Sequence, residues 1–579
     1  MKFNLALLFI LLFNLYSCRK ADSPSTRENI LNVAISEEVD TLDPANSYDT
    51  ISASVIYQAY EPLYEYHYLK RPYTLQPLLA ADFPTISNSG KTYKIPIKKN
   101  IYYHDNPVFE GKKREVIAQD FINQIKRLAF IPTKSNGWWL FDGKIEGINE
   151  WRKAVGSDLS KFESESISGL KALDNYTLEI TLTTPYPQMM YALAMTFTAP
   201  MPMEIIKKYN NILNDVIIGT GPFLLKESKR GVGVKLAKNP NYRSVIYPGK
   251  GDRYANAQGL LSDAGKKLPF LNGVHYKIKK ESNTRWLEFL SGNVDILVIP
   301  KDNFDTAISQ TGKLTPELES KNIRLQIAPT LIYWWLSFNM KDPVVGGKKN
   351  KNLRLAIAHA VDIAKYIEVF TNNVGQRANS IYPPGISGYN PSNTLPYSYN
   401  QEKAKEYLAK AGYPNGKGLP EIKFDVRGAH TTARQQGVFI KRELEKVGFK
   451  IKVVTNTFPG FLSKSRNGNL QFWLDGWAMD YPDAENSLQL LSNKNHPPGP
   501  NSTYYSNDEF EKIFSEIKLL PDGAQKTELM NKAEQLVIED MPWVMLYYAR
   551  NYILYQNHVK NFRRSDLINN TYKYLKIAK

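Results

Sequence analysis

Several segments alternate apolar and polar residues in a way that predicts β-strands with one buried face. Between Tyr176 and Leu182, apolar side chains occupy every second position and threonine or glutamate fills the others. The run Thr92–Lys98 alternates in the same way. Its Pro96 favours an edge strand, because proline cannot donate a ladder hydrogen bond.

Closer to the C-terminus, the pattern changes to strands separated by a long helix. Ile422–Val426 and Phe449–Val453 are short apolar-rich runs, and between them a helical pattern extends from about Thr432 to Val447. A strand, a helix and a second strand in this order predict parallel strands with a right-handed crossover. Leu470–Trp473 follows as the next strand, so the chain is of the α/β class.

The residues after that strand carry the most informative chemistry in the chain. We expect the strand to leave the sheet onto a loop, where Gly476 allows another backbone to approach because it lacks a Cβ. Asp480 then places a carboxylate beyond the strand end, where open α/β sheets bind ligands. Together they suit strand addition by an extended peptide whose α-ammonium meets the acid. The alternative is a strand end followed by an Asx-type turn before Pro482.

The N-terminus resembles an export signal. Nine apolar residues run from Leu5 to Phe13, too few to span a bilayer of ~30 Å. Cys18, the single cysteine, follows at the position of a bacterial lipobox, so we expect diacylation there and removal of residues 1–17. Residues 18–29 are polar and would form a tether. The alternative is ordinary signal cleavage nearby with an incidental cysteine.

The charge changes this picture little. The formal net charge is +17, but the lysines are spread along the chain without a basic stripe. We therefore expect a basic surface and no nucleic-acid partner. The rest of the chain contains no second apolar run near ~18 residues, which favours an exported protein.

The inventory of reactive groups argues against an enzyme. Seven histidines are present, none in a His-Glu-x-x-His helix, and no Gly-x-Ser-x-Gly elbow occurs. Asp480, Asp483 and Glu485 could imitate a glycosidase carboxylate pair, but three acids around a proline favour a turn. Gly219-Thr220-Gly221-Pro222 lacks the features of a phosphate loop and His104 lacks a second metal ligand, so both are interpreted as structural. We expect no catalysis, cofactor or metal.

A colinear set of motifs resembles solute-binding protein family five, the oligopeptide- and dipeptide-binding proteins of ABC importers. The resemblance covers about residues 30 to 555. Its principal motifs are Leu42-Asp43-Pro44, the helix Ala118-Gln119-Asp120 with Arg127, the turn Gly219–Phe223, and Gly476-Trp477 followed by Asp480-Tyr481.

The resemblance implies a periplasmic-binding-protein-like fold of type II or cluster C. Two α/β lobes would enclose a ligand cleft, with an inserted subdomain. Lobe I would comprise 30–60, 172–283 and 547–579, the insert 61–171, and lobe II 284–546. The crossings between lobes would lie near Ser282–Arg285 and Met545–Tyr548, and the protein would be a monomer.

The resemblance also implies the binding residues. Asp480 would meet the ligand α-amine, beside the backbone of Gly476 and Ala478. Leu474 stands where some relatives have an arginine for the ligand C-terminus, which leaves recognition of that end open. The aromatic candidates for the cleft are Trp477, Trp334, Trp335, Trp138 or Trp139, Tyr547 and Tyr548.

The implied function is capture of peptides and their delivery to an ABC permease and its ATPase. The protein would face the periplasm or the cell surface, anchored to the membrane by its N-terminal lipid. Two alternatives remain open at this point. One is a family-five binder of non-peptide cargo, such as a nickel chelate, an oligosaccharide or haem, and the other is a surface lipoprotein without an import role.

Overall fold

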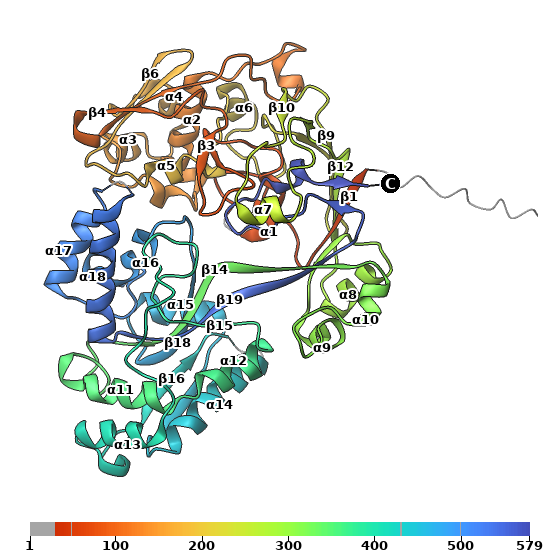
Figure 1. Cartoon of the computed structure of the whole chain (residues 1–579). Coiled ribbons are helices and arrows are strands. Elements are labelled where there is room, and N and C mark those ends of the chain that lie inside the picture. The colour runs from red at the N-terminus through yellow and green to blue at the C-terminus, as the bar shows by residue number, and fades with distance from the viewer. Residues whose placement is uncertain (1–28, 48, 429–430, 498, 521, 579) are drawn as a thin grey trace, which may run out of the picture.

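Two α/β lobes stand one above the other in the computed structural model, joined by two long strands (Figure 1). The structure describes residues 29–578 except 48, 429–430, 498 and 521. The expected signal peptide, Cys18 and the tether up to residue 28 lie outside the described residues. Within the described part of the chain, no helix is both long and apolar enough to cross a membrane.

One large mixed sheet runs through both lobes. From the second lobe to the first, its strands are β17 (Ile451–Thr455), β16 (Ile422–Val426), β18 (Phe472–Ala478), β14 (Arg324–Phe338), β19 (Trp543–Tyr555), β13 (Ile296–Val298), β1 (Ile30–Ile35), β12 (Gly273–Ile278), β9 (Gly233–Lys238) and β8 (Phe223–Lys229). The short β15 (Gln376–Arg377) also pairs with β19.

Helices cover this sheet and the smaller sheets of the first lobe. Before β14 in the chain lie α1 (Thr50–Ile56), α2 (Ala118–Ala129), α3 (Ile148–Val155), α4 (Leu159–Ser164), α5 (Met189–Ala192), α6 (Met203–Lys208), α7 (Arg253–Ala257), α8 (Ser282–Leu290), α9 (Phe304–Ala307) and α10 (Pro316–Ser320). After β14 lie α11 (Lys351–Ala360), α12 (Ile363–Thr371), α13 (Gln401–Lys410), α14 (Thr431–Glu445), α15 (Phe458–Arg466), α16 (Glu485–Leu488), α17 (Asp508–Ile517) and α18 (Ala524–Asp540).

The predicted β-α-β unit is confirmed. β16 and β17 are parallel neighbours in register from Ile422↔Ile451 to Val426↔Thr455, with α14 between them in the chain. β18 is longer than the four residues predicted, because it continues as far as Ala478. The prediction that Gly476 lies on a loop is therefore wrong.

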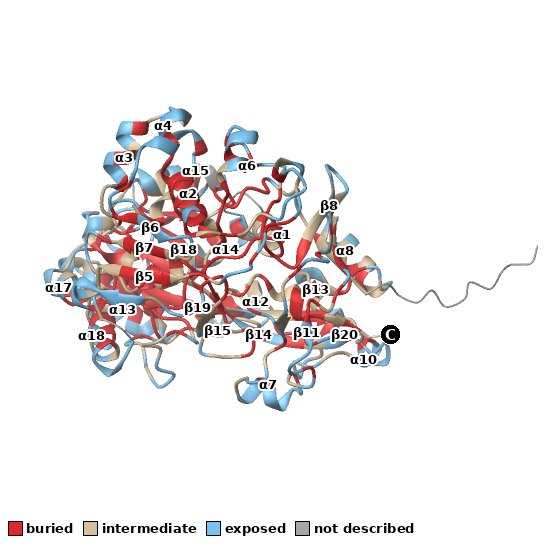
Figure 2. Cartoon of the chain, turned by 90° about the horizontal axis from the view of Figure 1, so that it is seen from above, coloured by how far each residue is buried: buried red, intermediate tan, exposed pale blue. Residues whose placement is uncertain are grey.

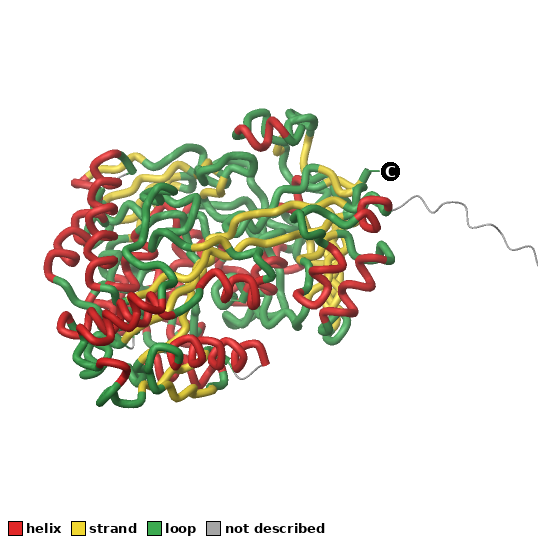
Figure 3. Tube along the Cα trace, turned by 60° about the horizontal axis from the view of Figure 1, so that its bottom comes forward, coloured by secondary structure: helices red, strands yellow, loops and turns green. Residues whose placement is uncertain are grey.

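β14 and β19 form the connection between the lobes. Arg324–Pro329 pairs with one half of β19 and Tyr333–Ser337 with the other, and the register shifts between Pro329 and Tyr333. Figure 3 shows the two strands running together across the molecule. An interrupted two-stranded ladder is a natural place for bending, so we propose a crossing in β14 near residues 329–333. The crossing expected near Ser282–Arg285 lies within α8 and stays a prediction.

Strand pairing also bears on where the lobes divide. β13 pairs with β1 and with β19, and α8, α9 and α10 share a small apolar core with β13. This supports moving residues 284–323 to lobe I. The insert has its own four-stranded sheet in the order β4 (Thr85–Ser87), β5 (Thr92–Pro96), β7 (Thr177–Thr181) and β6 (Leu170–Asp174). That sheet extends past residue 171, so the insert boundary would move too, and the division stays a proposal.

In the insert, the strand around Pro96 is interior, contrary to the edge position predicted. β5 lies between β4 and β7. Pro96 is tolerated because the β4 ladder ends at Lys94, and beyond that point Pro96 only accepts, through its carbonyl, from the Ala81 N–H at 2.8 Å. The missing N–H therefore removes no bond to β4.

Alternation along β14 separates two cores of the second lobe. Leu336 and Phe338 belong to the core under α11, α13 and α14, whereas Tyr333 and Trp335 belong to the core under α17 and α18. Adjacent strand residues point to opposite faces, which explains the division. Figure 2 shows buried residues concentrated along these central strands.

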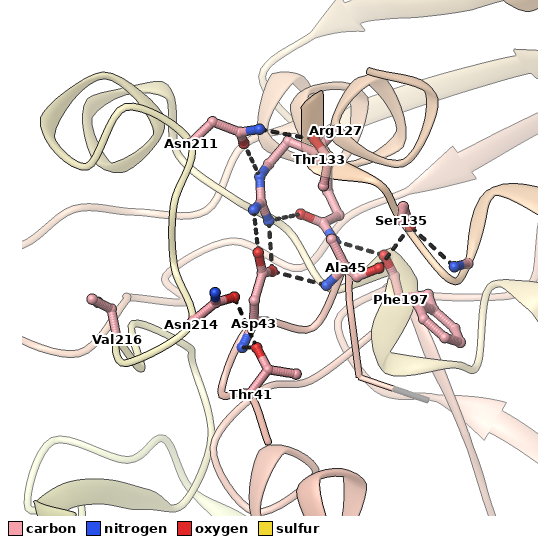
Figure 4. A network of polar contacts seen from close by, with 12 residues as sticks. Thr41, Asp43, Ala45, Arg127, Thr133, Ser135, Phe197, Asn211, Asn214 and Val216 are labelled. Carbon is pink, nitrogen blue, oxygen red and sulfur yellow. Dashed lines mark hydrogen bonds and ion pairs between the residues drawn. The ribbon is translucent and has the colours of Figure 1, made fainter. Parts of the chain in front are cut away.

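Two motifs of the first lobe meet in a buried ion pair (Figure 4). Arg127 of α2 donates from Nη1 and Nη2 to the two oxygens of Asp43, at 3.0 and 2.6 Å, and both side chains are at most 1% exposed. Arg127 Nε also donates to Asn211, and Asp43 accepts from the backbone N–H of Ala45. The bidentate geometry holds the loop after Pro44 against the insert.

The Gly219–Phe223 segment is the structural turn predicted. A Cβ on Gly219 would lie 2.0 Å from the carbonyl oxygen of Ala59, and one on Gly221 would lie 2.6 Å from it. His104 is buried, with Nε2 3.0 Å from the carbonyl oxygen of Gly221. Burial lowers the pKa of His104 to about 4, so its neutral form packs this turn.

Candidate functional site

The carboxyl end of β18 has a partly open edge. β18 pairs with β14 from Phe338↔Phe472 to Ile332↔Ala478. On its other side it pairs with β16 only at Phe472 and Trp473. In the described part of the chain, no strand therefore pairs with that side of residues 474–478. A row of backbone groups without a strand neighbour can accept an added strand.

Gly476 lies in the middle of this open stretch. A Cβ there would come within 2.6 Å of the Trp334 ring, so glycine is required because that ring crosses over the strand. Its carbonyl accepts from Arg427 Nη1 at 2.9 Å, and its N–H donates to Asp475 Oδ1 at 2.9 Å. Arg427 and Asp475 are themselves paired at 3.3 Å. Both backbone groups of Gly476 thus have side-chain partners that a ligand backbone could replace.

Arg427 is a candidate site residue that the sequence pattern could have indicated but that was not predicted. It directly follows β16, which is parallel to β18, so the two carboxyl ends lie at the same edge of the sheet. The rule that located Asp480 could therefore have located Arg427. Leu474 is buried in the core, whereas Arg427 contacts the next residue of β18, Asp475, at 3.3 Å.

Asp480 is half-buried just beyond β18. Its Oδ2 accepts from Asn486 Nδ2 at 3.0 Å, and its N–H donates to Asn486 Oδ1 at 3.1 Å. Burial raises the pKa of the Asp480 carboxyl, the hydrogen bond from Asn486 offsets part of that rise, and no described cation contributes. A half-buried carboxylate with no positive partner would gain from a ligand ammonium.

The neighbouring acids have different partners. Asp483 accepts from the N–H of Glu485 at 2.9 Å and pairs with Lys526 at 2.5 Å, with both side chains buried. Glu485 accepts from the Tyr481 hydroxyl. Asp483 therefore stabilises the turn, and its role differs from the one considered for Asp480.

Aromatic residues of the first lobe contact this region. Tyr191 of α5 stacks on Tyr481 with ring centroids 5.5 Å apart, and Tyr66 stacks on Tyr191 at 6.4 Å. Burial, followed by the carboxylates of Glu485 and then Asp483 and Asp480, raises the pKa of Tyr186. The two lobes are thus in contact beside Asp480 in this conformation.

The predicted aromatic residues divide into two groups. Trp334 lies over Gly476 and stacks on Tyr547 at 6.3 Å, and Trp477 donates from Nε1 to Asn486, which also holds Asp480. Trp335 and Tyr548 instead lie in the core, 3% and 1% exposed. These two leave almost no surface for a ligand, so we assign them packing roles.

For the predicted pair Trp138 or Trp139, the surroundings favour Trp139. Lys144 lies 5.8 Å from the Trp139 ring and 4.6 Å from the Tyr186 ring, which is near Asp480. Trp138 is instead covered by the Arg152 guanidinium at 4.9 Å. Among the described residues, no group of three or more histidine, cysteine, aspartate or glutamate side chains could hold a metal ion.

Comparisons with known proteins agree on one family. The profile described as bacterial extracellular solute-binding proteins, family 5 middle, matches residues 74–498. The glutathione-binding protein GsiB of Escherichia coli K12 is 24% identical over 539 residues, covering 91% of this chain and 90% of its own.

Two solved structures are similar over nearly the whole chain. The periplasmic binding protein DppA of Helicobacter pylori, in complex with the peptide STSA, has a TM-score of 0.71 at 25% identity and covers 95% of this chain and 98% of its own. HbpA2 of Haemophilus parasuis has a TM-score of 0.76 at 22% identity and covers 95% and 100%.

Proposed function

Because the chain belongs to family 5 of the bacterial extracellular solute-binding proteins, the extracytoplasmic binding components of ABC importers, we propose that it captures short peptides with free termini. Members of this family are binding proteins rather than enzymes. One observation carries the proposal. Asp480, a half-buried carboxylate without a cation beside it, and Arg427 both lie at the same edge of the sheet. They would receive the α-ammonium and the carboxylate of one peptide.

The ligand backbone would pair with the open edge of β18. Gly476 offers one N–H and one C=O there, at present bonded to Asp475 and Arg427. A ligand amide can replace both partners, which releases Arg427 toward the ligand carboxylate. The exchange preserves the hydrogen bonds of Gly476, so little is lost by opening the edge.

The spacing of the two charges favours a short cargo. Asp480 follows Gly476 by four residues, at most about 13 Å at ~3.3 Å per residue. An extended tripeptide spans about 10 Å. Two or three residues therefore fit between the acid and the arginine. The similarity to a glutathione-binding protein supports cargo of this size, whereas the similar binder from Helicobacter pylori holds a peptide one residue longer.

Closure of the lobes would signal to the permease that a ligand is bound. The stacked Tyr191 and Tyr481 already join the lobes beside Asp480. A ligand touching both lobes stabilises the closed state by its differential affinity for that state. The permease would recognise this state, while ATP hydrolysis occurs in the transporter.

Native mass spectrometry of the purified protein would identify the cargo, and calorimetry would test Asp480. We would titrate alanine di-, tri- and tetrapeptides and glutathione, then the best ligand with and without an N-acetyl group. Asp480→Asn should weaken binding of the free-amine peptide by roughly 30-fold or more, since leaving the ligand ammonium unpaired costs ~2–5 kcal/mol. The acetylated peptide should be barely affected.

Asp305→Asn, which changes an exposed acid on α9, is the matched control and should bind like wild type. Equal weakening of free and acetylated peptides would make Asp480 structural. If no peptide in the panel binds and the co-purified ligand is a metal chelate, a sugar or haem, the cargo is not a peptide.

A further inference from the structure

A pocket lies at the connection between the lobes, on the outer edge of β19. β13 pairs with residues 553–555 of that strand and β15 pairs with residues 547–548, which leaves a gap between the two. A pocket of about 260 Å³ fills this gap. The site proposed for peptides lies on the other side of the β14–β19 pair, along β18, which borders β14 and not β19.

Both lobes contribute apolar walls to this pocket. Val298 and Phe304 come from β13 and α9 of the first lobe, and Phe370 and Val374 come from α12 and the segment after it. Figure 1 shows α9 and α12 on the same side of the long strands. The Asn372 amide donates to the backbone carbonyl of Lys301 at 3.3 Å, so the two lobes also contact each other at the pocket.

The charged groups of the pocket are of one sign. Lys301 and Arg550 line it, and the described lining holds no carboxylate. Within the described part of the chain, the Arg550 guanidinium donates to the neutral amide of Gln376, and neither cation forms an ion pair. Two cations beside apolar side chains favour a molecule that carries a negative group on an apolar body.

We propose that this hinge pocket binds small molecules composed of a compact apolar body and one carboxylate. Its volume equals that of about nine waters at ~30 Å³ each, which suits a body of roughly that many heavy atoms. The apolar part would lie between Phe304 and Phe370, and the carboxylate would meet Lys301 and Arg550. Tyr547, which stacks on Trp334, also lines this pocket, but the pocket lies on the opposite side of the β14–β19 pair from β18. Binding here does not depend on the proposed function, and only its coupling to peptide binding does.

Occupancy of the pocket would be coupled to lobe closure. The bound molecule touches both lobes in a conformation where Tyr191 of one lobe stacks on Tyr481 of the other. It would stabilise this conformation, which we assign as closed, and a peptide that favours closure would therefore bind more tightly. Linkage requires the effect to be reciprocal.

The test is calorimetric titration of the full chain with 3-phenylpropanoate in the absence of peptide. Wild type should bind it saturably, and the neutral 3-phenylpropan-1-ol at least tenfold more weakly. The double variant Lys301→Gln/Arg550→Gln should lose at least tenfold in affinity for the acid. Lys313→Gln, an exposed lysine elsewhere on the first lobe, is the matched control and should bind like wild type.

Val374→Trp should block the pocket, and circular dichroism would show that each variant is folded. Asp480→Asn should bind the probe as wild type does, which separates this site from the peptide site. Equal binding by wild type and the double variant would overturn the proposal, as would loss of binding in Asp480→Asn. A peptide affinity that does not rise when the probe is saturating would overturn the coupling.

Discussion

Replacing Arg427 with glutamine tests how the ligand C-terminus is recognised. In the structure, Arg427 Nη1 donates to the Gly476 carbonyl at 2.9 Å and lies 3.3 Å from Asp475 Oδ1. If the ligand carboxylate replaces the carbonyl, the variant leaves that carboxylate unpaired in a desolvated site. Truncating one partner of such a pair costs ~2–5 kcal/mol. The lower limit corresponds to about 30-fold in Kd.

The assay compares one tripeptide with its C-terminal amide by calorimetry on both proteins. Wild type should prefer the acid by about 30-fold or more, whereas Arg427→Gln should bind acid and amide alike. The double-mutant cycle isolates the interaction, because both changes remove the same contact. The variant also leaves Asp475 without its cation. Since burial already raises the pKa of Asp475 and Arg427 lowers it, that carboxyl should then titrate at higher pH.

A second variant separates recognition from packing. Arg427→Gln/Asp475→Asn removes both charges and should recover the stability lost by unpairing Asp475, while the preference for the acid remains absent. If Arg427→Gln weakens acid and amide by the same factor, Arg427 only closes the edge of β18 and the ligand carboxylate is bound elsewhere.

Three further outcomes are expected. Labelling cells with an alkynyl palmitate should tag wild type but not Cys18→Ala, and equal labelling of both would reject lipidation at Cys18. Small-angle scattering should show a smaller radius of gyration with saturating peptide, and no change would indicate a rigid connection at β14 and β19. Because the folded state raises the pKa of Asp480, stability falls as pH rises from about the unfolded value of 3.8 through the folded one. Urea unfolding of ligand-free Asp480→Asn should therefore show higher stability than wild type near pH 7, with the gap closing in acid; a gap independent of pH would contradict this.

Several parts of the fold follow from local pattern because the forces involved are local. The alternation in Thr177–Thr181 and the β-α-β unit from β16 to β17 were predictable, since side-chain periodicity decides which face of an element is buried. The position of Asp480 followed from the same unit, because the carboxyl ends of parallel strands share an edge. Arg427 lies at that edge for the same reason.

Other features depend on partners distant in sequence. No local signal decides whether residues 474–478 belong to β18 or to a loop. Their pairing with β14, more than a hundred residues earlier in the sequence, makes them part of the strand. Trp334 and Trp335 are adjacent and chemically alike. Their separation into a ring over Gly476 and a core side chain depends on which face of β14 each one occupies.

The sequence by itself determined the α/β class, the family and the acid that we assign to the ligand amine, because periodicity, strand order and motif spacing are properties of the sequence alone. Only the tertiary structure decided where the lobes are joined, which aromatic residues remain near the site, and that Arg427 and Asp475 bond to the backbone of Gly476. These depend on strand register and on contacts between segments such as 427 and 476, or 301 and 372. Such contacts are selected by packing of the whole domain, and no local pattern encodes them.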